Sequence, residues 1–233
     1  MEKLEGGNTN SVYKDEDTVI RNTTSNSAFV HSLLQWLESK GYEESPRLLD
    51  SDNGKERLTY IQGEVGNYPL KNFFQTDATL VSAAKLLRKL HDITTTFEIS
   101  GTARSGEVVC HNDFAPYNIV YRDDRIVGII DFDQASFGTR IWDVAYSVYR
   151  FAPLGTDAHC LQGWGTIPDR KTRFKLFCDV YGINDYQAVL DTVLRRIHTL
   201  MTYMIDTDQK LEHLSLYEKD ILYIKDNYKY LSS

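Results

Sequence analysis

One stretch constrains the fold more than any other. Within residues 108–146, two short apolar runs at 119–121 and 126–130 surround a polar turn at 122–125, a pattern that predicts a β-hairpin. A hairpin brings its two ends together, so polar residues just before it and just after it can converge on one point. The sequence therefore predicts a site built from both ends of this hairpin.

The polar residues at these ends are of the types that phosphoryl transfer requires. Asp113 and Asn118 precede the hairpin, and Asp131 follows it. One acidic side chain can orient a hydroxyl, while an amide oxygen and a carboxylate are suitable ligands for Mg²⁺. We predict that Asp113 is catalytic and that Asn118 and Asp131 are the metal ligands. The alternative is that they are capping and turn residues around a surface hairpin.

The spacing of these residues resembles a known family. His111, Asp113 and Asn118 form a His-x-Asp-x-x-x-x-Asn pattern; Asp131 follows the hairpin and Asp143 lies further along. This order resembles the catalytic segment of the aminoglycoside phosphotransferase and choline kinase group, the small-molecule relatives of protein kinases. The resemblance implies that His111 packs within the catalytic loop and that Asp143 braces this loop through its backbone.

The same resemblance implies the fold class. We expect an α+β, protein-kinase-like fold with two lobes, in which a small N-terminal antiparallel sheet with one helix precedes a larger, mainly helical C-terminal lobe. The predicted lobes are a nucleotide-binding lobe at 1–64 and a catalytic and substrate-binding lobe at 65–233. Apolar residues recur at helical spacing in five further segments. These segments are 27–40, 77–92, 169–181, 186–206 and 215–231.

Two features of the first lobe are interpreted as nucleotide contacts. A glycine turn joins the first predicted strands, and its backbone N–H groups can approach phosphates closely; the residues are Gly6, Gly7 and Asn8. In the resembling family, the third strand carries a basic residue that grips the phosphates, and Arg21 fits that place. The alternative for Arg21 is a solvated charge at a strand end.

The chain departs from the family after Arg21. Kinase-like helices at this point usually carry a glutamate that pairs with the strand cation, yet residues 22–35 contain none. His31 lies near the expected place, but an imidazole cannot replace a carboxylate. We therefore expect Arg21 to lack this ion pair.

A second hairpin leads to the linker between the lobes. Residues 45–50 and 56–61 predict two strands around an Asn-Gly turn, and the composition changes at 62–66. In the family, this region meets adenine through backbone groups. The candidates here are Thr59, Tyr60 and Ile61.

Composition limits the partners and the compartment. The 26 basic and 33 acidic residues give a net charge of −7, which disfavours nucleic acid or an anionic membrane as partner. No apolar run approaches the ~20 residues of a membrane helix, and the N-terminus lacks the pattern of a signal peptide. We expect a cytoplasmic protein. Its cysteines should be free thiols: Cys110, Cys160 and Cys178.

The predicted function is transfer of the γ-phosphate of a Mg²⁺-bound nucleotide, ATP or GTP, to a hydroxyl of a small molecule. Acidic residues and tyrosines near the C-terminus favour a cationic acceptor, such as an aminoglycoside or an amino alcohol. The acidic residues are Asp206, Asp208, Glu212, Glu218 and Asp220.

Two other functions remain open. One is nucleotide binding without turnover, as in an immunity or sensor protein, which the missing helix glutamate supports. The other is a metal-dependent phosphohydrolase, but the sequence lacks the histidine and carboxylate ligands of a two-metal site.

Overall fold

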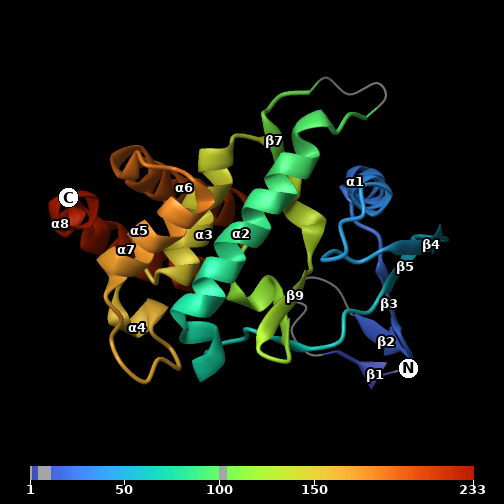
Figure 1. The fold of residues 1–233 in the computed structure, drawn as a ribbon, viewed down its shortest axis with the longest axis horizontal. Coiled ribbons are helices and arrows are strands. Elements are labelled where there is room, and N and C mark those ends of the chain that lie inside the picture. Colours follow the sequence, from blue (N-terminus) through green and yellow to red (C-terminus); the bar gives the residue numbers. More distant parts are fainter. Residues whose placement is uncertain (1, 5–11, 100–103) are drawn as a thin grey trace.

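The computed structural model describes residues 2–4, 12–99 and 104–233. Figure 1 shows a sheet with one flanking helix on one side and a larger group of helices on the other. This arrangement confirms the predicted α+β class with a small N-terminal and a larger helical part. Among the described residues, no helix is long and apolar enough to cross a membrane. The predicted phosphate turn, which comprises Gly6, Gly7 and Asn8, lies outside the described residues.

The N-terminal sheet is antiparallel and has the strand order β1-β2-β3-β5-β4. Its strands are β1 (Glu2–Lys3), β2 (Tyr13–Asp15), β3 (Thr18–Asn22), β4 (Leu48–Asp52) and β5 (Lys55–Thr59). The turn between β4 and β5 uses Asn53 and Gly54, both with positive φ, as the Asn-Gly pair predicts. Helix α1 (Ser27–Ser39) follows β3 and buries Val30, Leu33 and Leu37, in agreement with the apolar spacing.

The predicted hairpin is present and has an additional strand. It consists of β8 (Ile119–Arg122) and β9 (Arg125–Ile129), joined by a turn in which Asp123 and Asp124 both have positive φ. Strand β6 (Glu64–Val65) pairs with β8 on its other side. The predicted lobe boundary after Glu64 therefore falls inside β6, a strand that is hydrogen-bonded to the hairpin.

Helices form the rest of the larger lobe. They are α2 (Asp77–Ile93), α3 (Arg140–Phe151), α4 (Asp157–Cys160), α5 (Arg170–Tyr181), α6 (Tyr186–Thr207), α7 (Leu214–Asp226) and α8 (Tyr228–Ser232). Helix α3 packs on α6, and α2 packs on α5. The helix predicted over 215–231 is divided, because α7 ends at Asp226 and α8 begins at Tyr228, with Asn227 between them.

The core of the larger lobe lies between these helices and continues under the hairpin. Leu87 and Leu90 of α2, Val144 and Val148 of α3, and Val193 of α6 are all fully buried. Each such side chain stabilises the fold by about 1.5–3 kcal/mol through removal of apolar surface from water. A packed layer thus supports the segment between β7 (Val108–Cys110) and β10 (Ser136–Gly138). These two strands pair antiparallel, and the β8–β9 hairpin lies between them in the sequence.

Candidate active site

The loop after β7 is held by one carboxylate from α3. Asp143 accepts the backbone N–H of His111 at 2.7 Å and that of Asn112 at 2.8 Å, using one oxygen for each. The His111 ring bonds through Nε2 to the carbonyl of Ile130 at 3.0 Å, so it links the loop to the end of β9. Both supporting roles implied by the family resemblance are confirmed.

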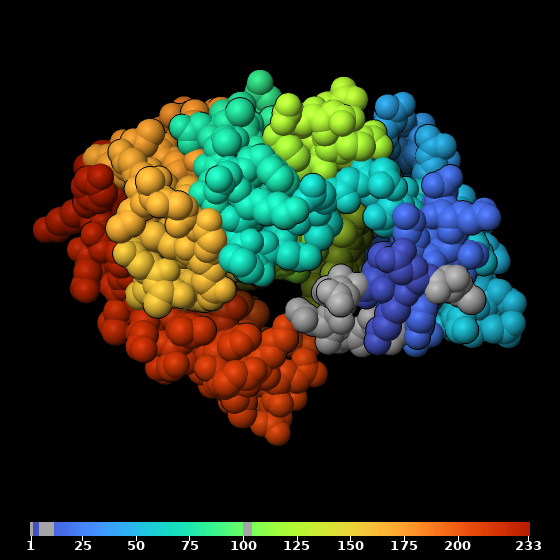
Figure 2. All heavy atoms as spheres, turned by 90° about the horizontal axis from the view of Figure 1, so that it is seen from below, coloured from blue at the N-terminus to red at the C-terminus, as the bar shows by residue number. Residues whose placement is uncertain are grey.

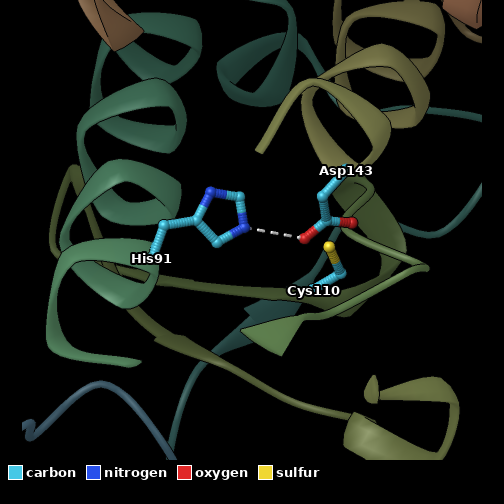
Figure 3. Close-up of side chains that lie close together, drawn as sticks. All are labelled: His91, Cys110 and Asp143. Atoms are coloured by element: carbon cyan, nitrogen blue, oxygen red, sulfur yellow. Dashed lines mark hydrogen bonds and ion pairs between the residues drawn. The ribbon is translucent and has the colours of Figure 1, made fainter. Parts of the chain in front are cut away.

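A second histidine lies beneath this brace. His91 of α2 contacts Asp143 Oδ2 through Nε2 at 3.0 Å and Tyr181 Oη through Nδ1 at 2.6 Å. Figure 3 shows the His91 ring directed at Asp143, with Cys110 alongside. His91 and Asp143 have no exposed surface. Burial opposes ionisation of Asp143, but bonds from His91 and from the His111 backbone lower the pKa of this carboxyl.

The three groups in Figure 3 are close enough to hold a metal ion, but their chemistry indicates a structural cluster. Burial and the nearby Asp143 raise the pKa of the Cys110 thiol, which keeps it protonated and a poor ligand. Both oxygens of Asp143 already accept backbone hydrogen bonds. The cysteines Cys110, Cys160 and Cys178 are free and buried, as predicted.

Asp113 is fixed at both of its oxygens. Asn118 donates from Nδ2 to the backbone carbonyl of Asp113 and to its Oδ2, each at 2.9 Å. Tyr117 donates its hydroxyl to Asp113 Oδ1 at 2.6 Å. Because the Asn118 side-chain nitrogen donates to Asp113, the Asn118 amide oxygen is the atom that could bind a metal ion. Tyr117 was not predicted from the sequence; its place directly before Asn118 was the only available signal.

The two ends of the hairpin converge as predicted. The N–H of Ile130 donates to the backbone carbonyl of Asn118 at 2.9 Å, which places Asp131 beside Asn118. Asp131 has a φ of +64°, in the left-handed region, and its side chain is half exposed. An amide oxygen and a carboxylate at one partly exposed place form a donor set that fits Mg²⁺.

Arg21 reaches this place from β3. Its Nη2 contacts Asp133 Oδ1 at 2.6 Å, its Nη1 lies 3.7 Å from Asp131 Oδ1, and its Nε donates to Glu56 Oε1 at 2.5 Å. The guanidinium is therefore not a solvated strand-end charge; the Arg21 side chain is only 11% exposed. These carboxylates raise the pKa of Arg21 although burial acts in the opposite direction.

The helix glutamate is absent from its usual place, as predicted, but Arg21 has a carboxylate partner that was not foreseen. No glutamate of helix α1 pairs with Arg21, but Glu56 of β5 lies directly opposite Arg21 in the sheet register. Glu56 is buried, and its other oxygen pairs with His31 of α1. Sheet and helix thus share one carboxylate, which replaces the helix-borne residue of the family pattern. The sequence signal was a glutamate on the strand that pairs with the Arg21 strand.

Asp133 connects the lobes. Besides its bond to Arg21, its backbone carbonyl accepts a hydrogen bond from Asn26 Nδ2 at 2.9 Å, and the same amide donates to the carbonyl of Ala135 at 3.0 Å. Burial raises the pKa of Asp133, while Arg21 opposes this shift. The start of α1 is therefore attached to the segment that follows the metal-ligand candidate Asp131.

With this geometry established, comparison with known proteins gives a consistent result. Residues 100–171 match the sequence model of the Phosphotransferase enzyme family, a span that contains the catalytic loop, the hairpin and Asp143. This match confirms the predicted family resemblance. A curated relative, the Trifolitoxin immunity protein of Rhizobium leguminosarum bv. trifolii, is 29% identical over 202 residues, which cover 79% of this chain and 75% of that protein.

Solved structures show the same fold. An amicoumacin kinase in complex with AMP-PNP, Ca²⁺ and Ami has a TM-score of 0.71 at 12% identity, covering 94% of this chain and 87% of that chain. A choline kinase from Cryptosporidium parvum Iowa II has a TM-score of 0.69 at 12% identity, covering 98% and 90%. These likenesses confirm the protein-kinase-like two-lobe fold.

The three residues proposed to meet adenine lie at the end of β5. The N–H of Thr59 donates to the Arg47 carbonyl at 3.0 Å, and the N–H of Tyr60 donates to the Asp17 carbonyl at 2.8 Å. Both N–H groups are therefore engaged within the small lobe. An adenine contact of the kind expected for the phosphotransferase family would use the carbonyl groups or Ile61, and it stays a prediction.

The acidic residues predicted to attract a cation do not form one set. Four of them are exposed: Asp206, Asp208, Glu212 and Glu218. Asp220 is fully buried, because it lies on the same face of α7 as Ile221 and Ile224. It accepts bonds from Tyr149 Oη at 2.6 Å and from the Thr156 backbone at 2.7 Å. Its assignment to an acidic surface was therefore wrong.

Proposed function

We propose that this protein is a small-molecule phosphotransferase, which moves the γ-phosphate of Mg²⁺-bound ATP or GTP to a hydroxyl group. The observation that carries the proposal is the fixation of Asp113. Tyr117 and Asn118 hold one carboxylate oxygen each, at the hairpin end where Asp131 and Arg21 also lie. Such positioning accounts for most of the catalysis in phosphoryl transfer.

In this proposal, Asp113 orients the acceptor hydroxyl and accepts its proton late in the transfer. A carboxylate is a weak base at neutral pH, so its main contribution is to direct the oxygen at the phosphorus. The fixed carboxylate suits this task because little conformational entropy is lost when it reaches the reactive arrangement. Tyr117 acts through Asp113 and is a positioning residue.

Asn118 and Asp131 would hold the Mg²⁺ ion, since hard cations prefer oxygen ligands. When bound, the ion neutralises charge on the phosphates. Arg21 is the proposed phosphate-binding cation, and Glu56 keeps its guanidinium directed toward Asp131. Arg21 can bind phosphate oxygens with two parallel N–H groups. The glycine turn at Gly6 and Gly7 is proposed to contribute backbone N–H groups to the same phosphates.

The acceptor is proposed to be a small alcohol that carries an amino group, such as an aminoglycoside or an amino alcohol. Exposed acidic residues between α6 and α7 support this choice, because they attract a cation to the large-lobe side. Fold neighbours named as an amicoumacin kinase and a choline kinase also support it.

A second candidate function is nucleotide binding without turnover in an immunity protein. The Trifolitoxin immunity relative favours it. Because Glu56 gives Arg21 a carboxylate partner, the missing helix glutamate no longer supports binding without turnover. The complete fixation of Asp113 favours turnover, because a protein that only binds nucleotide has no use for an oriented proton acceptor.

Nucleotide consumption with and without acceptors separates these functions. Purified protein is incubated with Mg-ATP or Mg-GTP and a panel of aminoglycosides, amino alcohols and neutral sugars. We expect release of nucleoside diphosphate that depends on the acceptor and is lost in Asp113→Ala. Calorimetric nucleotide binding without turnover would instead establish the binding function, and consumption that is independent of acceptor would establish hydrolysis.

A further inference from the structure

Among the described residues, Arg150 near Asp113 has no carboxylate partner, in contrast to Arg170 and Arg173 of α5. Arg150, in the last turn of α3, stacks with its Cζ 5.3 Å from the ring centre of Tyr68, 5.7 Å from that of Tyr117 and 5.5 Å from that of Tyr149. Among the residues that the structure describes, its buried Nε has no hydrogen-bond partner. Ring faces attract a cation, but they do not use its N–H donors.

The buried arginines of α5 show the contrast. Arg170 pairs with Asp157 and Arg173 pairs with Asp77, both at 2.6 Å. Each of these guanidinium groups also donates to a backbone carbonyl. Arg150 is partly buried, and its buried Nε lacks the acceptor that a desolvated donor requires, so its environment is incomplete by comparison with theirs.

Two of the tyrosines around Arg150 are hydrogen-bonded to carboxylates. Tyr117 and Tyr149 both stack against the guanidinium, and each uses its hydroxyl on a carboxylate, Asp113 in the first case and Asp220 in the second, at 2.6 Å. Two tyrosines therefore stand between this cation and the two acidic groups. Tyr146 adds a third hydroxyl, 2.8 Å from that of Tyr117.

This cation lies on the acceptor side of the site. The ring of Tyr117 faces the Arg150 guanidinium, and its hydroxyl donates to the carboxylate of Asp113, so one tyrosine links Arg150 to the proposed catalytic carboxylate. Tyr68 belongs to the segment before α2, and Figure 2 shows a hollow between this part of the chain, in teal, and the orange-red C-terminal helices. The hollow gives a small molecule a route to this part of the larger lobe.

We propose that Arg150 binds a carboxylate of the acceptor, so that the substrate is an amino-bearing alcohol that also carries an acidic group, such as a hydroxy amino acid or an amino sugar acid. The planar guanidinium fork matches a carboxylate with two parallel hydrogen bonds. This inference rests on the proposed phosphotransferase function and defines its substrate class more narrowly.

Matched pairs of probes test it. Serine is compared with ethanolamine, threonine with 1-aminopropan-2-ol, and 2-amino-2-deoxyglucuronic acid with glucosamine. The members of the first two pairs differ only by the carboxylate, and in the third pair a carboxylate replaces the hydroxymethyl group. Binding to the full-length protein is measured by calorimetry in the presence of Mg-AMP-PNP. We expect the acid to bind about 10- to 100-fold more tightly in at least one pair, the range of a charged hydrogen-bonded contact.

Three variants assign this preference to Arg150. Arg150→Met should remove it, and Arg150→Lys should keep a smaller preference because a point charge replaces the fork. Arg150→Lys also decides the question if the methionine variant does not fold. Arg173→Met, which breaks the pair with Asp77, is the matched control: it should lower the unfolding temperature and leave the preference unchanged.

The outcomes distinguish the inference from the proposed function. Equal binding of both members in every pair, or a preference that persists in Arg150→Met, overturns the inference; acceptor-dependent turnover of the amino alcohols would then still support the phosphotransferase. Binding of acids that depends on Arg150, without nucleotide turnover on any probe, supports the carboxylate site and counts against the phosphotransferase.

Discussion

The two sides of the catalytic hairpin hold aspartates in opposite ways. On the large-lobe side, Asp143 is fully buried and accepts bonds from two backbone N–H groups and His91. On the small-lobe side, Asp131 is half exposed and lies 3.7 Å from Arg21. The first arrangement fixes the backbone of the loop after β7, whereas the exposed carboxylate of Asp131 can exchange one partner for another. The site thus combines a rigid support with an ionic side on which we propose that a metal and a nucleotide bind.

This contrast predicts the largest effect for Asp143→Ala. The change leaves two backbone N–H groups and a histidine buried without their acceptor, so the free energy of unfolding should fall by about 3–5 kcal/mol. Asp131→Ala removes a longer and more exposed ion pair, and should cost less than ~1 kcal/mol. Urea unfolding of both variants checks this, and similar midpoints would remove the distinction between the two sides.

Asp113→Ala should separate binding from turnover. Loss of the group that orients the hydroxyl should lower kcat about 10²- to 10⁴-fold, while the dissociation constant of the Mg-nucleotide changes little, because Asp113 addresses the acceptor. Calorimetry and steady-state kinetics measure the two quantities. Parallel loss of affinity and turnover would show that Asp113 belongs to the metal side.

Substitution of the two metal-ligand candidates should weaken nucleotide binding to different extents. Asp131→Ala should weaken Mg²⁺-dependent nucleotide binding about tenfold or more, and Asn118→Ala should weaken it less, since a charged oxygen ligand contributes more to holding a dication. Magnesium titrations of nucleotide affinity provide the measurement. Curves that match the wild-type curve for both variants would refute the metal assignment.

Glu56→Gln should have the smallest effect on function in this series. The amide keeps the shape of the side chain and loses the charge that faces Arg21, so we expect a few-fold loss of nucleotide affinity and about 1 kcal/mol of stability. Glu44→Gln is the matched control, because the Glu44 carboxylate pairs with Lys89 and not with Arg21. Glu44 contacts the hairpin only through its backbone carbonyl, which accepts the N–H of Ile129 and is not changed by the substitution. An equal loss of affinity in the two variants would mean that Glu56 has no special part in directing Arg21.

The sequence predicted those features that depend on local pattern. The hairpin followed from two short apolar runs around a polar turn, and the supporting roles of His111 and Asp143 were implied by the family resemblance. The Glu56–Arg21 pair could not be found in this way, because it depends on the register between two strands that are 35 residues apart at this point.

Other features depend on three-dimensional packing. Asp220 looked like one of several acidic residues on a C-terminal helix, and only its place on the buried face of α7 shows its structural role. Arg150 gave no signal, since its neighbours Tyr68, Tyr117 and Tyr149 come from separate parts of the chain. Sequence patterns identify chemistry within one segment more readily than contacts between segments.

The pairing of β6 with β8 determines where the chain can be divided. Residues 61–63 lie between the last hydrogen bond of Tyr60 to the small lobe and the start of β6, and three residues span at most about 10 Å. A polypeptide cut there would leave both sheets whole. A cut after Val65 would remove a strand from the catalytic hairpin and leave β8 as an open edge, the kind of surface on which separate chains add to one another and aggregate.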